Sequence, residues 1–582
     1  MSGGSSLDEK TSSLDHGYKA STLAIVNSSS AAEKAGRPHF FIEESSSHGA
    51  FVGEQGGNGA QVTIQDVWGA PVETSSLLKS LGSIGLTLIY WPIGLLISLA
   101  GISVYLEFTS YFPSRSGAEV VYLEQAYRKP RFFFPVAFAV QTVILSFVSS
   151  NAIVLIGPYY EVVAEYIFKM TDHTPSDWES KGVGIAALTI IILPVFFSTN
   201  ISLRLSNILG IAKIITLLII IIPGFVALGG HFKVVPDPTA NFHNAFEGTT
   251  NNGYNLSNAL VNIIFSYGGY TNSFNVANEI KNPIRTIKYT ANTAVIFVAV
   301  LYMLTNIAYF AVLTQEEIKG STQVTATLFW EKLWGSKVSK GLTILPVLSA
   351  SSNILNTIVG HSRMIREIGR QGVLPYPKFW VTTWPIGTPT GALFAIWFVS
   401  LIVIVVVPAG NAFNFIVALQ NYPSSFFLVL MTLGLFIVRR DRRRLSLPRP
   451  EYRSWTIVVL FFLAANTFLI IMPWVPPTGG VNNSSFGFFY AASSLTGLGI
   501  VFLCGFYYVL WSKLLPKWKG YKLRQTVITL ADGALTHKMV KVKNEDVDAW
   551  DVTHDPSGRL LNEDEDLVEI NEEHASLRDL KE

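Results

Sequence analysis

The sequence predicts an all-α fold, a polytopic bundle of helices that cross a membrane. Of the 582 residues, 49% are hydrophobic and only 14% are charged, whereas a soluble domain carries about a quarter charged residues. The apolar residues are concentrated in the middle of the chain, because residues 1–82 and 514–582 are polar. Apolar and polar residues do not alternate with period two, which argues against a membrane β-barrel.

Eleven stretches are long enough to span a membrane, since a helix needs about 20 mostly apolar residues to cross the hydrocarbon core. Buried helices of a soluble protein do not explain them, because runs such as 214–222 recur too often and are too long. In chain order the stretches lie near 84–107, 134–162, 182–200, 207–229, 256–278, 291–314, 341–360, 390–408, 413–438, 456–474 and 488–513. Together they define a transmembrane domain over residues 69–513.

The basic residues of the loops predict how the bundle is oriented. Loops on one side are rich in Lys and Arg, above all the segment from Arg439 to Arg453, whereas loops on the other side hold few. Basic loops resist translocation and stay in the cytoplasm. The C-terminal tail begins with Lys513, Lys517 and Lys519 on the basic side, so we expect a cytoplasmic C-terminus.

Both ends of the chain have the composition of solvated tails. Residues 1–68 are rich in Ser and Gly, and we expect them to form a disordered N-terminal tail of the cytoplasmic type. Residues 514–582 form a predicted cytoplasmic C-terminal tail that is acidic at its end, around 562–569. Segments with low hydrophobicity and high charge cannot bury a core of their own, so no regular structure is expected in either tail.

Motifs of enzymes, cofactor sites and metal sites are missing from the sequence. It contains no His-Glu-x-x-His, no phosphate-binding P-loop and no Gly-x-Ser-x-Gly, and its ten His residues are scattered. The one cysteine, Cys504, allows neither a disulfide within the chain nor a zinc cluster. The predicted spans are nearly free of the ionisable residues that membrane-embedded catalysis requires. We therefore expect no enzymatic activity, no cofactor, no metal and no nucleic-acid partner.

The fifth apolar stretch contains the segment Phe-Ser-Tyr-Gly-Gly-Tyr-Thr-Asn at residues 265–272. Each of two adjacent glycines costs about 1 kcal/mol in a helix interior relative to alanine, and the polar side chains beside them hydrogen-bond readily to backbone. This composition predicts a discontinuous helix, whose freed amides suit a carboxylate and whose freed carbonyls suit an ammonium group. The alternative is an unbroken helix that packs its two glycines against a neighbouring helix.

Three charged residues near this segment or in another span have more than one interpretation. Glu279 and Lys281 precede Pro283 at the cytoplasmic end of the helix, where they form either a gate of ion pairs or a solvated loop. Lys213 lies inside the stretch 207–229, where a lysine must be paired, neutral, or able to extend its amine to the interface. The residues alone leave these alternatives open.

The segment 265–272, followed by Glu-Ile-Lys-Asn-Pro at 279–283, resembles the amino acid–polyamine–organocation superfamily, specifically its L-type branch. The resemblance extends from about Val72 to Leu523, and the tail with Leu-Leu-Pro-Lys-Trp at 514–518 is most similar to fungal high-affinity methionine permeases. Further segments that carry the resemblance lie at 82–85, 105–108, 116–119, 122–124, 207–213, 244–249 and 366–375.

This resemblance implies a fold of two inverted five-helix repeats plus two helices, with substrate bound between the broken first and sixth helices. Phe265 is then a candidate gate, and Lys213 falls where sodium-driven relatives have a sodium site. The substrate-binding residues that the match implies are Phe265, Ser266, Tyr267, Gly268, Gly269, Asn272, Asn421 and Tyr422. The coupling or gate residues that it implies are Lys213, Glu279 and Lys281.

The start of the chain departs from the family pattern. Residues 40–82 contain no spanning run, and only Val72 to Leu86 resembles the second half of the first helix. The Gly-Ser/Thr-Gly break that holds the substrate carboxylate in the family has no counterpart beyond Gly69, so no carboxylate-binding residue is assigned. Because eleven spans place the two termini on opposite faces, we expect an incomplete first helix in a truncated or mis-spliced form that transports poorly.

Together these features predict a secondary active transporter of the plasma membrane that imports neutral amino acids, methionine or a similar one, by alternating access. The expected partners are the amino-acid substrate, protons as the coupling ion, and the lipid bilayer. The alternative is a permease-like sensor that binds an amino acid without transporting it. An exchanger with a disulfide-linked heavy chain is rejected, because it needs an extracellular cysteine and Cys504 lies within a span.

Overall fold

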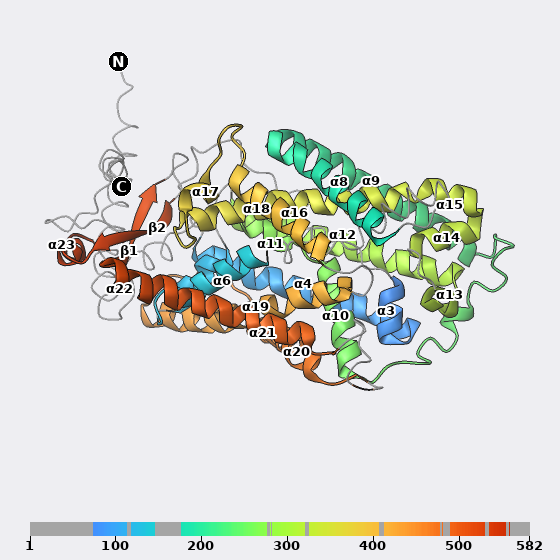
Figure 1. Cartoon of the computed structure of the whole chain (residues 1–582). Helices are drawn as coiled ribbons and strands as arrows, with labels where there is room; N and C mark the ends of the chain where they lie inside the picture. Colours follow the sequence, from blue (N-terminus) through green and yellow to red (C-terminus); the bar gives the residue numbers. More distant parts are fainter. Residues whose placement is uncertain are drawn as a thin grey trace, which may run out of the picture.

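The structure, a computed structural model, describes residues 74–112, 118–127, 129–145, 176–275, 277, 280, 282–320, 325–406, 412–477, 480, 489–529, 535–554 and 558. Most of its long helices run along the length of the molecule (Figure 1). Seven helices within these ranges are long and apolar enough to cross a membrane. They contain α4 (Ile84–Tyr111), α9 (Thr199–Leu228), α12 (Pro283–Val312), α16 (Ile344–Arg370), α19 (Ala412–Arg444), α20 (Thr456–Ile471) and α21 (Ala492–Val509). The spans of α16, α20 and α21 include the short elements next to them and cover Ser336–Arg370, Thr456–Trp474 and Ala492–Lys519.

Shorter helices occupy the remaining predicted stretches. Three are single apolar helices, α6 (Phe133–Ile144), α8 (Asp177–Phe197) and α18 (Thr390–Val406), and the fifth stretch is divided into α10 (Gly253–Ser266) and α11 (Tyr270–Asn275). Each of the eleven stretches therefore contains helix, and the prediction of a polytopic membrane helix bundle is confirmed. Residues 146–162 of the second stretch lie outside the described residues.

Short elements cover the two ends of the bundle (Figure 1). One end, named here the α3 end, carries α3 (Thr74–Leu81), α13 (Gln315–Gly320), α14 (Thr325–Trp334) and α15 (Ser336–Leu342). The opposite hairpin end carries α17 (Pro377–Val381), α22 (Leu515–Lys519), a two-stranded sheet and α23 (Val547–Thr553). The remaining elements are α5 (Glu119–Ala126), the 3₁₀ turns η3 (Ala240–Phe242) and η5 (Met472–Trp474), and the π-helical turn η6 (Leu510–Leu514).

The helix α3 lies where the family resemblance expects the second half of the first helix. Its Leu77, Leu78 and Leu81 side chains are fully buried, and it packs against α10, α13 and α4. Gly82 follows it with φ +80°, a left-handed value that favours glycine. The residues before 74 lie outside the described residues, so the incomplete first helix stays a prediction.

Capping residues in the sequence fix where two of the helices begin. The side-chain oxygen of Asn252 accepts hydrogen bonds from the backbone nitrogens of Tyr254 at 2.9 Å and Asn255 at 3.3 Å, which satisfies free donors at the start of α10. Pro283 opens α12, where its missing N–H has no helical partner to lose. Short-range signals of this kind therefore position both sides of the broken helix.

The C-terminal tail contains regular structure that the sequence analysis did not predict. Strands β1 (Tyr521–Thr529) and β2 (Leu535–Lys543) form an antiparallel hairpin in which Tyr521 lies opposite Lys543. The hairpin is followed by α23. The prediction of an all-α chain with an unstructured C-terminal tail is therefore wrong for this segment, although the rest of the described chain is helical apart from turns and loops.

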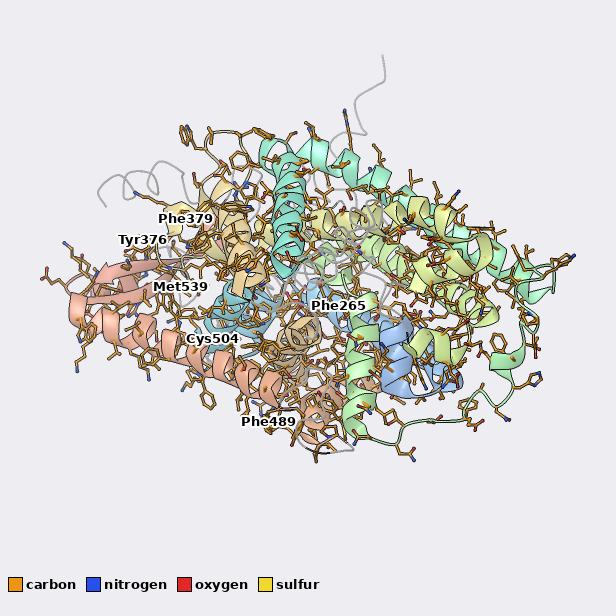
Figure 2. All side chains as sticks on the ribbon, turned by 45° about the vertical axis from the view of Figure 1, so that its right-hand side comes forward. Phe265, Tyr376, Phe379, Phe489, Cys504 and Met539 are labelled. Carbon is orange, nitrogen blue, oxygen red and sulfur yellow. The ribbon has the colours of Figure 1, made fainter. Side chains whose placement is uncertain are left out.

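The hairpin is held by the helix bundle, which explains why its own composition did not reveal it. The backbone N–H of Met539 in β2 donates to the carbonyl of Gln371 at 2.9 Å, and Gln525 Nε2 in β1 donates to Glu124 Oε1 at 2.7 Å. Glu124 lies 401 positions earlier in the chain. Figure 2 shows Met539 at the same end of the molecule as Phe379 of α17.

Candidate functional site

The broken helix is the central feature of the candidate site. The helix α10 ends at Ser266 and α11 begins at Tyr270. The backbone N–H of Tyr267 donates to the carbonyls of Ile263 and Ile264, and that of Gly268 donates to Phe265 at 3.0 Å, so the last turn tightens before the chain leaves the helix. The structure thus confirms the predicted discontinuity at the glycine pair and excludes an unbroken helix.

The two glycines meet different requirements at the break. Gly269 has φ +113°, a conformation that other L-residues adopt only with strain. At Gly268 an added Cβ would lie 3.0 Å from the carbonyl oxygen of Phe265, which is closer than ordinary van der Waals contact. A side chain at either position therefore opposes the break, for a backbone reason at Gly269 and a steric reason at Gly268.

The helix α4 supports both halves of the broken helix through glycines on one of its faces. A Cβ at Gly94 would lie 2.3 Å from a methyl carbon of Ile263 and 3.0 Å from the Tyr267 ring. A Cβ at Gly101 would lie 2.3 Å from the Tyr270 hydroxyl. Because seven residues make two helical turns, these glycines share a face, and their lack of side chains lets α10 and α11 approach α4 closely.

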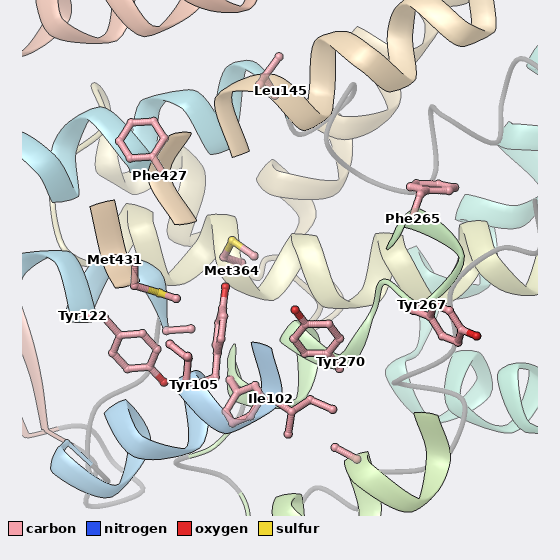
Figure 3. Packing of buried hydrophobic residues seen from close by; sticks show 14 of the residues in the cluster. Ile102, Tyr105, Tyr122, Leu145, Phe265, Tyr267, Tyr270, Met364, Phe427 and Met431 are labelled. Carbon is pink, nitrogen blue, oxygen red and sulfur yellow. The ribbon is translucent and has the colours of Figure 1, made fainter. Parts of the chain in front are cut away.

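Phe265 and Tyr267 flank the start of the break and point in different directions (Figure 3). The Tyr267 hydroxyl donates to the Trp91 carbonyl at 3.1 Å, and its ring lies 5.9 Å from that of Trp91 and 6.0 Å from that of Tyr302. Its side chain is 1% exposed. Tyr267, a predicted substrate contact, therefore packs between α4 and α12 and holds the start of the break in place.

Ser266 and Asn272 lie on either side of the glycines. Ser266 is fully buried, and its Oγ donates to the carbonyl of Asn262 at 3.2 Å. Asn272 of α11 lies against α16, where a Cβ added at Gly360 would be 3.2 Å from its Cγ. Asn272 therefore faces α16, whereas Ser266 turns back onto its own helix.

A small cavity between α10, α19, α20, η5 and α21 is lined by two of the predicted residues. Asn421 and Tyr422 of α19 line it together with Tyr254 and Asn258 of α10. The further lining residues are Val261, Ala418, Ser425, Leu469, Pro473, Ser493 and Ser494. The α10 residues precede Phe265 by one to three helical turns, so this cavity lies beside the half-helix that leads into the break.

Lys213 lies near the middle of α9 and is directed into the bundle. Its side chain is 3% exposed, and its Nζ donates to Asn353 Oδ1 on α16. Gly360, which lies against the Asn272 side chain, follows Asn353 by two helical turns on α16. The Lys213 amine therefore does not extend to the membrane interface. Lys213 and Asn272 both contact α16, two helical turns apart.

The predicted residues therefore form two groups, with the break between them. Asn421 and Tyr422 line the cavity next to α10, whereas Lys213 and Asn272 contact α16. Glu279 and Lys281 lie outside the described residues, so their role as a gate stays a prediction. Sequence reasoning missed Asn353, although an asparagine inside a span is a signal of function.

A buried ion pair at the hairpin end was also missed. Arg439 of α19 binds Glu107 of α4 through both carboxylate oxygens, with Nε to Oε1 at 2.7 Å and Nη2 to Oε2 at 2.6 Å. Tyr111 and the backbone N–H of Ser454 also donate to this carboxylate, at 2.6 Å and 2.9 Å. The only carboxylate in the stretch 84–107 was the available signal, because an ionisable residue in a span needs a partner.

The described residues hold no group of three or more His, Cys, Asp or Glu side chains that could bind a metal ion. The candidate site is instead made of amides, hydroxyls, aromatic rings and helix ends around a backbone break. The end of α10 presents carbonyl oxygens and the surrounding rings present apolar faces, a combination suited to a small molecule with an ammonium group and an apolar side chain.

Comparison with known proteins places this arrangement in context. A model of the amino acid permease family matches residues 60–503. The chain is 34% identical over 484 residues to the high-affinity methionine permease of Saccharomyces cerevisiae, covering 83% of this chain and 82% of the relative. It is 28% identical over 459 residues to the low-affinity methionine permease of the same yeast, covering 78% and 80%. It is also 27% identical over 408 residues to b(0,+)-type amino acid transporter 1 of Mus musculus, covering 69% and 78%.

Proposed function

The chain belongs to the amino acid permease family, and we propose that it is a secondary active transporter that imports neutral amino acids, methionine or a similar one, together with protons. The observation that carries this proposal is the break at Gly268 and Gly269 in the middle of a multi-pass bundle. The methionine permeases of yeast support the choice of substrate.

The break provides recognition for both ends of an amino acid. The C-terminal end of α10 carries a partial negative charge that favours an ammonium group, and Phe265 at its last turn supplies an apolar surface for a side chain such as that of methionine. Gly268 and Gly269 allow a substrate to approach the backbone. Ser266, Tyr267 and Asn272 then act mainly by holding the two half-helices in register, as their contacts with α10, α4 and α16 suggest.

Transport then proceeds by alternating access around this site. We infer an architecture of two inverted five-helix repeats plus two helices, in which α3 stands for the second half of the first helix. The cavity with Asn421 and Tyr422 lies beside the N-terminal part of α10, which follows a loop with few basic residues, and this supports it as the extracellular approach. The hairpin end, where the basic loops and the C-terminal tail lie, is the cytoplasmic end in this proposal, and the membrane is the plasma membrane.

Protons are the proposed coupling ion, and Lys213 occupies the place of a sodium site in the family resemblance. Its Nζ is held by Asn353, and a neutral amide oxygen accepts from a protonated or a deprotonated amine alike. No disulfide-linked heavy chain is part of the proposal. Cys504 supports this, because it is fully buried within α21.

Uptake of radiolabelled amino acids in cells that lack their own permeases tests the proposal. We expect cells that express this chain to take up methionine slowly, in keeping with the incomplete first helix predicted from the sequence. Other neutral amino acids should compete and charged ones should compete little, and the uptake should be lost when a protonophore is added. Equal surface expression without uptake would contradict transport.

A ligand-binding measurement separates a transporter from an amino-acid sensor. Purified protein that is stabilised against heat by methionine, but that carries no methionine into vesicles under an imposed pH gradient, would favour the sensor. Binding together with gradient-dependent uptake supports the transporter. Cells with an empty vector and vesicles without a gradient serve as controls.

A further inference from the structure

A second buried carboxyl besides that of Glu107 lies between the broken helix and the hairpin end. Glu119 begins α5 and is 8% exposed. The Tyr105 hydroxyl donates to its Oε1 at 2.5 Å. Its other oxygen, Oε2, is buried and has no hydrogen-bond partner among the described residues. A buried ionised carboxylate needs compensation on both oxygens, so this position is suited to a carboxyl that carries a proton.

Tyr105 connects this carboxyl to α11, the second half of the broken helix. Its ring lies 6.1 Å from that of Tyr270 and 5.1 Å from that of Phe274, both on α11. Figure 3 shows Tyr105, Tyr122 and Tyr270 in the same cluster of buried side chains. Any displacement of α11 would therefore remove the rings that pack on Tyr105 and open the surroundings of Glu119.

The helix α11 also carries polar groups that the closed packing does not satisfy. Ser273 Oγ and both polar atoms of the Asn275 side chain are buried without a hydrogen-bond partner among the described residues. Each such group destabilises the packed state, because it has lost its hydrogen bonds to water without gaining others. Water would therefore stabilise α11 by hydrogen bonding to these groups. Hydration of α11 would also bring water towards Glu119 when the hairpin end opens.

We propose that Glu119 carries the coupled proton, holding it while α11 is packed on Tyr105 and releasing it to the cytoplasm when α11 moves. This inference rests on the proposed proton-coupled uptake. The proton enters from the extracellular side, binds Glu119 Oε2, and leaves from the same oxygen after water reaches the carboxyl. Substrate release and proton release then share one movement, that of α11.

Burial provides the holding step. It raises the pKa of the Glu119 carboxyl above its ordinary value, while the hydrogen bond from Tyr105 and a backbone hydrogen bond lower it by smaller amounts. Exposure to water would return the pKa towards the ordinary value of about 4.3, so a proton bound in the buried state would dissociate at neutral cytoplasmic pH. The direction agrees with import, in which the cytoplasmic side must receive the proton.

The groups around Glu119 leave this titration to the carboxyl itself. The titratable side chains that face it within the described residues are the tyrosines Tyr105 of α4, Tyr122 of α5 and Tyr270 of α11. The helix α6 packs against α5 but contains no titratable residue in its described range. Tyrosines remain neutral in the acidic range in which a carboxyl titrates.

Charged residues of the neighbouring elements are engaged elsewhere. On α19, which also packs against α5, Arg439 binds Glu107 and Arg442 lies 4.5 Å over the Tyr111 ring. On β1, Gln525 binds the other carboxylate of α5, Glu124. Glu124 is therefore a satisfied carboxylate on the same helix as Glu119, and a matched control.

The experiment compares Glu119→Gln with Glu124→Gln in the uptake assay. Glutamine keeps the size and the hydrogen bond from Tyr105 but cannot release a proton. We expect Glu119→Gln to lose accumulation against a gradient and the dependence of uptake on external pH, while exchange of external for internal methionine continues. Glu124→Gln should keep both accumulation and pH dependence.

A second variant keeps the test informative if Glu119→Gln does not reach the cell surface. Tyr105→Phe keeps the ring that packs against α11 and removes the hydrogen bond that stabilises the Glu119 carboxylate. The pKa of Glu119 should therefore rise, and the pH of half-maximal uptake should shift upward. An unchanged pH profile in Tyr105→Phe, or pH-dependent accumulation by Glu119→Gln, overturns the role of Glu119. Absence of uptake by the unmodified chain overturns the proposed function first, and this inference with it.

Discussion

The hairpin end of the bundle and its middle each bury a cation, and they hold it in different ways. At the hairpin end Arg439 forms two charged hydrogen bonds with Glu107 and also donates to the Ser454 carbonyl at 2.7 Å. In the middle, Lys213 donates to the amide oxygen of Asn353. The first contact requires both partners to be ionised, whereas the second is possible with a protonated or a neutral amine.

This difference separates a structural lock from a group that can change its charge. A bidentate pair between arginine and carboxylate fixes two helices and the segment before α20 in one geometry, and arginine does not lose its proton in proteins. A lysine held by a neutral acceptor can exchange a proton without losing its contact. We therefore expect variants at the hairpin end to reduce stability first, and variants in the middle to reduce transport first.

The largest effect is expected from breaking the lock with Glu107→Gln. Arg439 would then remain buried without its counter-charge, and removal of one member of a buried pair costs about 3–5 kcal/mol. Surface abundance should fall sharply, together with the melting temperature of the purified protein. Glu107→Gln with Arg439→Gln should recover part of the loss, and a double variant no better than the single one would contradict the lock.

The substitution Gly268→Val should abolish transport while leaving the abundance of the protein unchanged. The added side chain would crowd the Phe265 carbonyl and the substrate, and it would resist the break. Uptake should fall to background at equal surface expression. Gly499→Val is the matched control, because a Cβ at Gly499 on α21 meets nothing within 4 Å. Near-normal uptake by Gly268→Val would contradict the role of the break.

A smaller effect on transport is expected from Lys213→Ala. Loss of the amine should lower uptake by about tenfold, equivalent to ~1.4 kcal/mol, and flatten its pH dependence, with a weaker effect on abundance. Lys181→Ala is a suitable control, because Lys181 is another buried lysine, whose Nζ donates to the Val405 carbonyl at 3.1 Å. If uptake and pH dependence survive in Lys213→Ala, the middle of the bundle is as structural as the hairpin end.

The smallest effect should come from an ion pair at the surface of the hairpin end. Arg524 binds Asp551 at 2.6 Å, and this guanidinium holds the pKa of the Asp551 carboxyl below its usual range. Solvent screens the pair, so Arg524→Ala should cost about 0.2–1 kcal/mol. Its melting temperature should match that of Asp551→Asn and of the unmodified protein closely. A loss as large as that of Glu107→Gln would show that the hairpin also locks the bundle.

The sequence by itself determined the features that depend on local composition. Each spanning stretch is recognisable because about 20 apolar residues must be consecutive to cross a bilayer. The break at Gly268 and Gly269 is recognisable because two adjacent glycines destabilise a helix interior, and the polar residues that can hydrogen-bond to the freed backbone stand in the same segment. The resemblance to the permease family likewise rests on short segments such as 265–272 and 279–283.

Only the tertiary structure decided which polar groups meet. Glu107 and Arg439 are 332 positions apart and Lys213 and Asn353 are 140 positions apart, so no spacing rule connects them. The same holds for Asn421 and Tyr422, whose position beside α10 depends on how α19 packs, and for the hairpin, whose backbone partner is Gln371. Hydrophobic patterning states that a helix is inserted, but it does not state which of its faces meets which neighbour, because lipid and protein interior are similarly apolar.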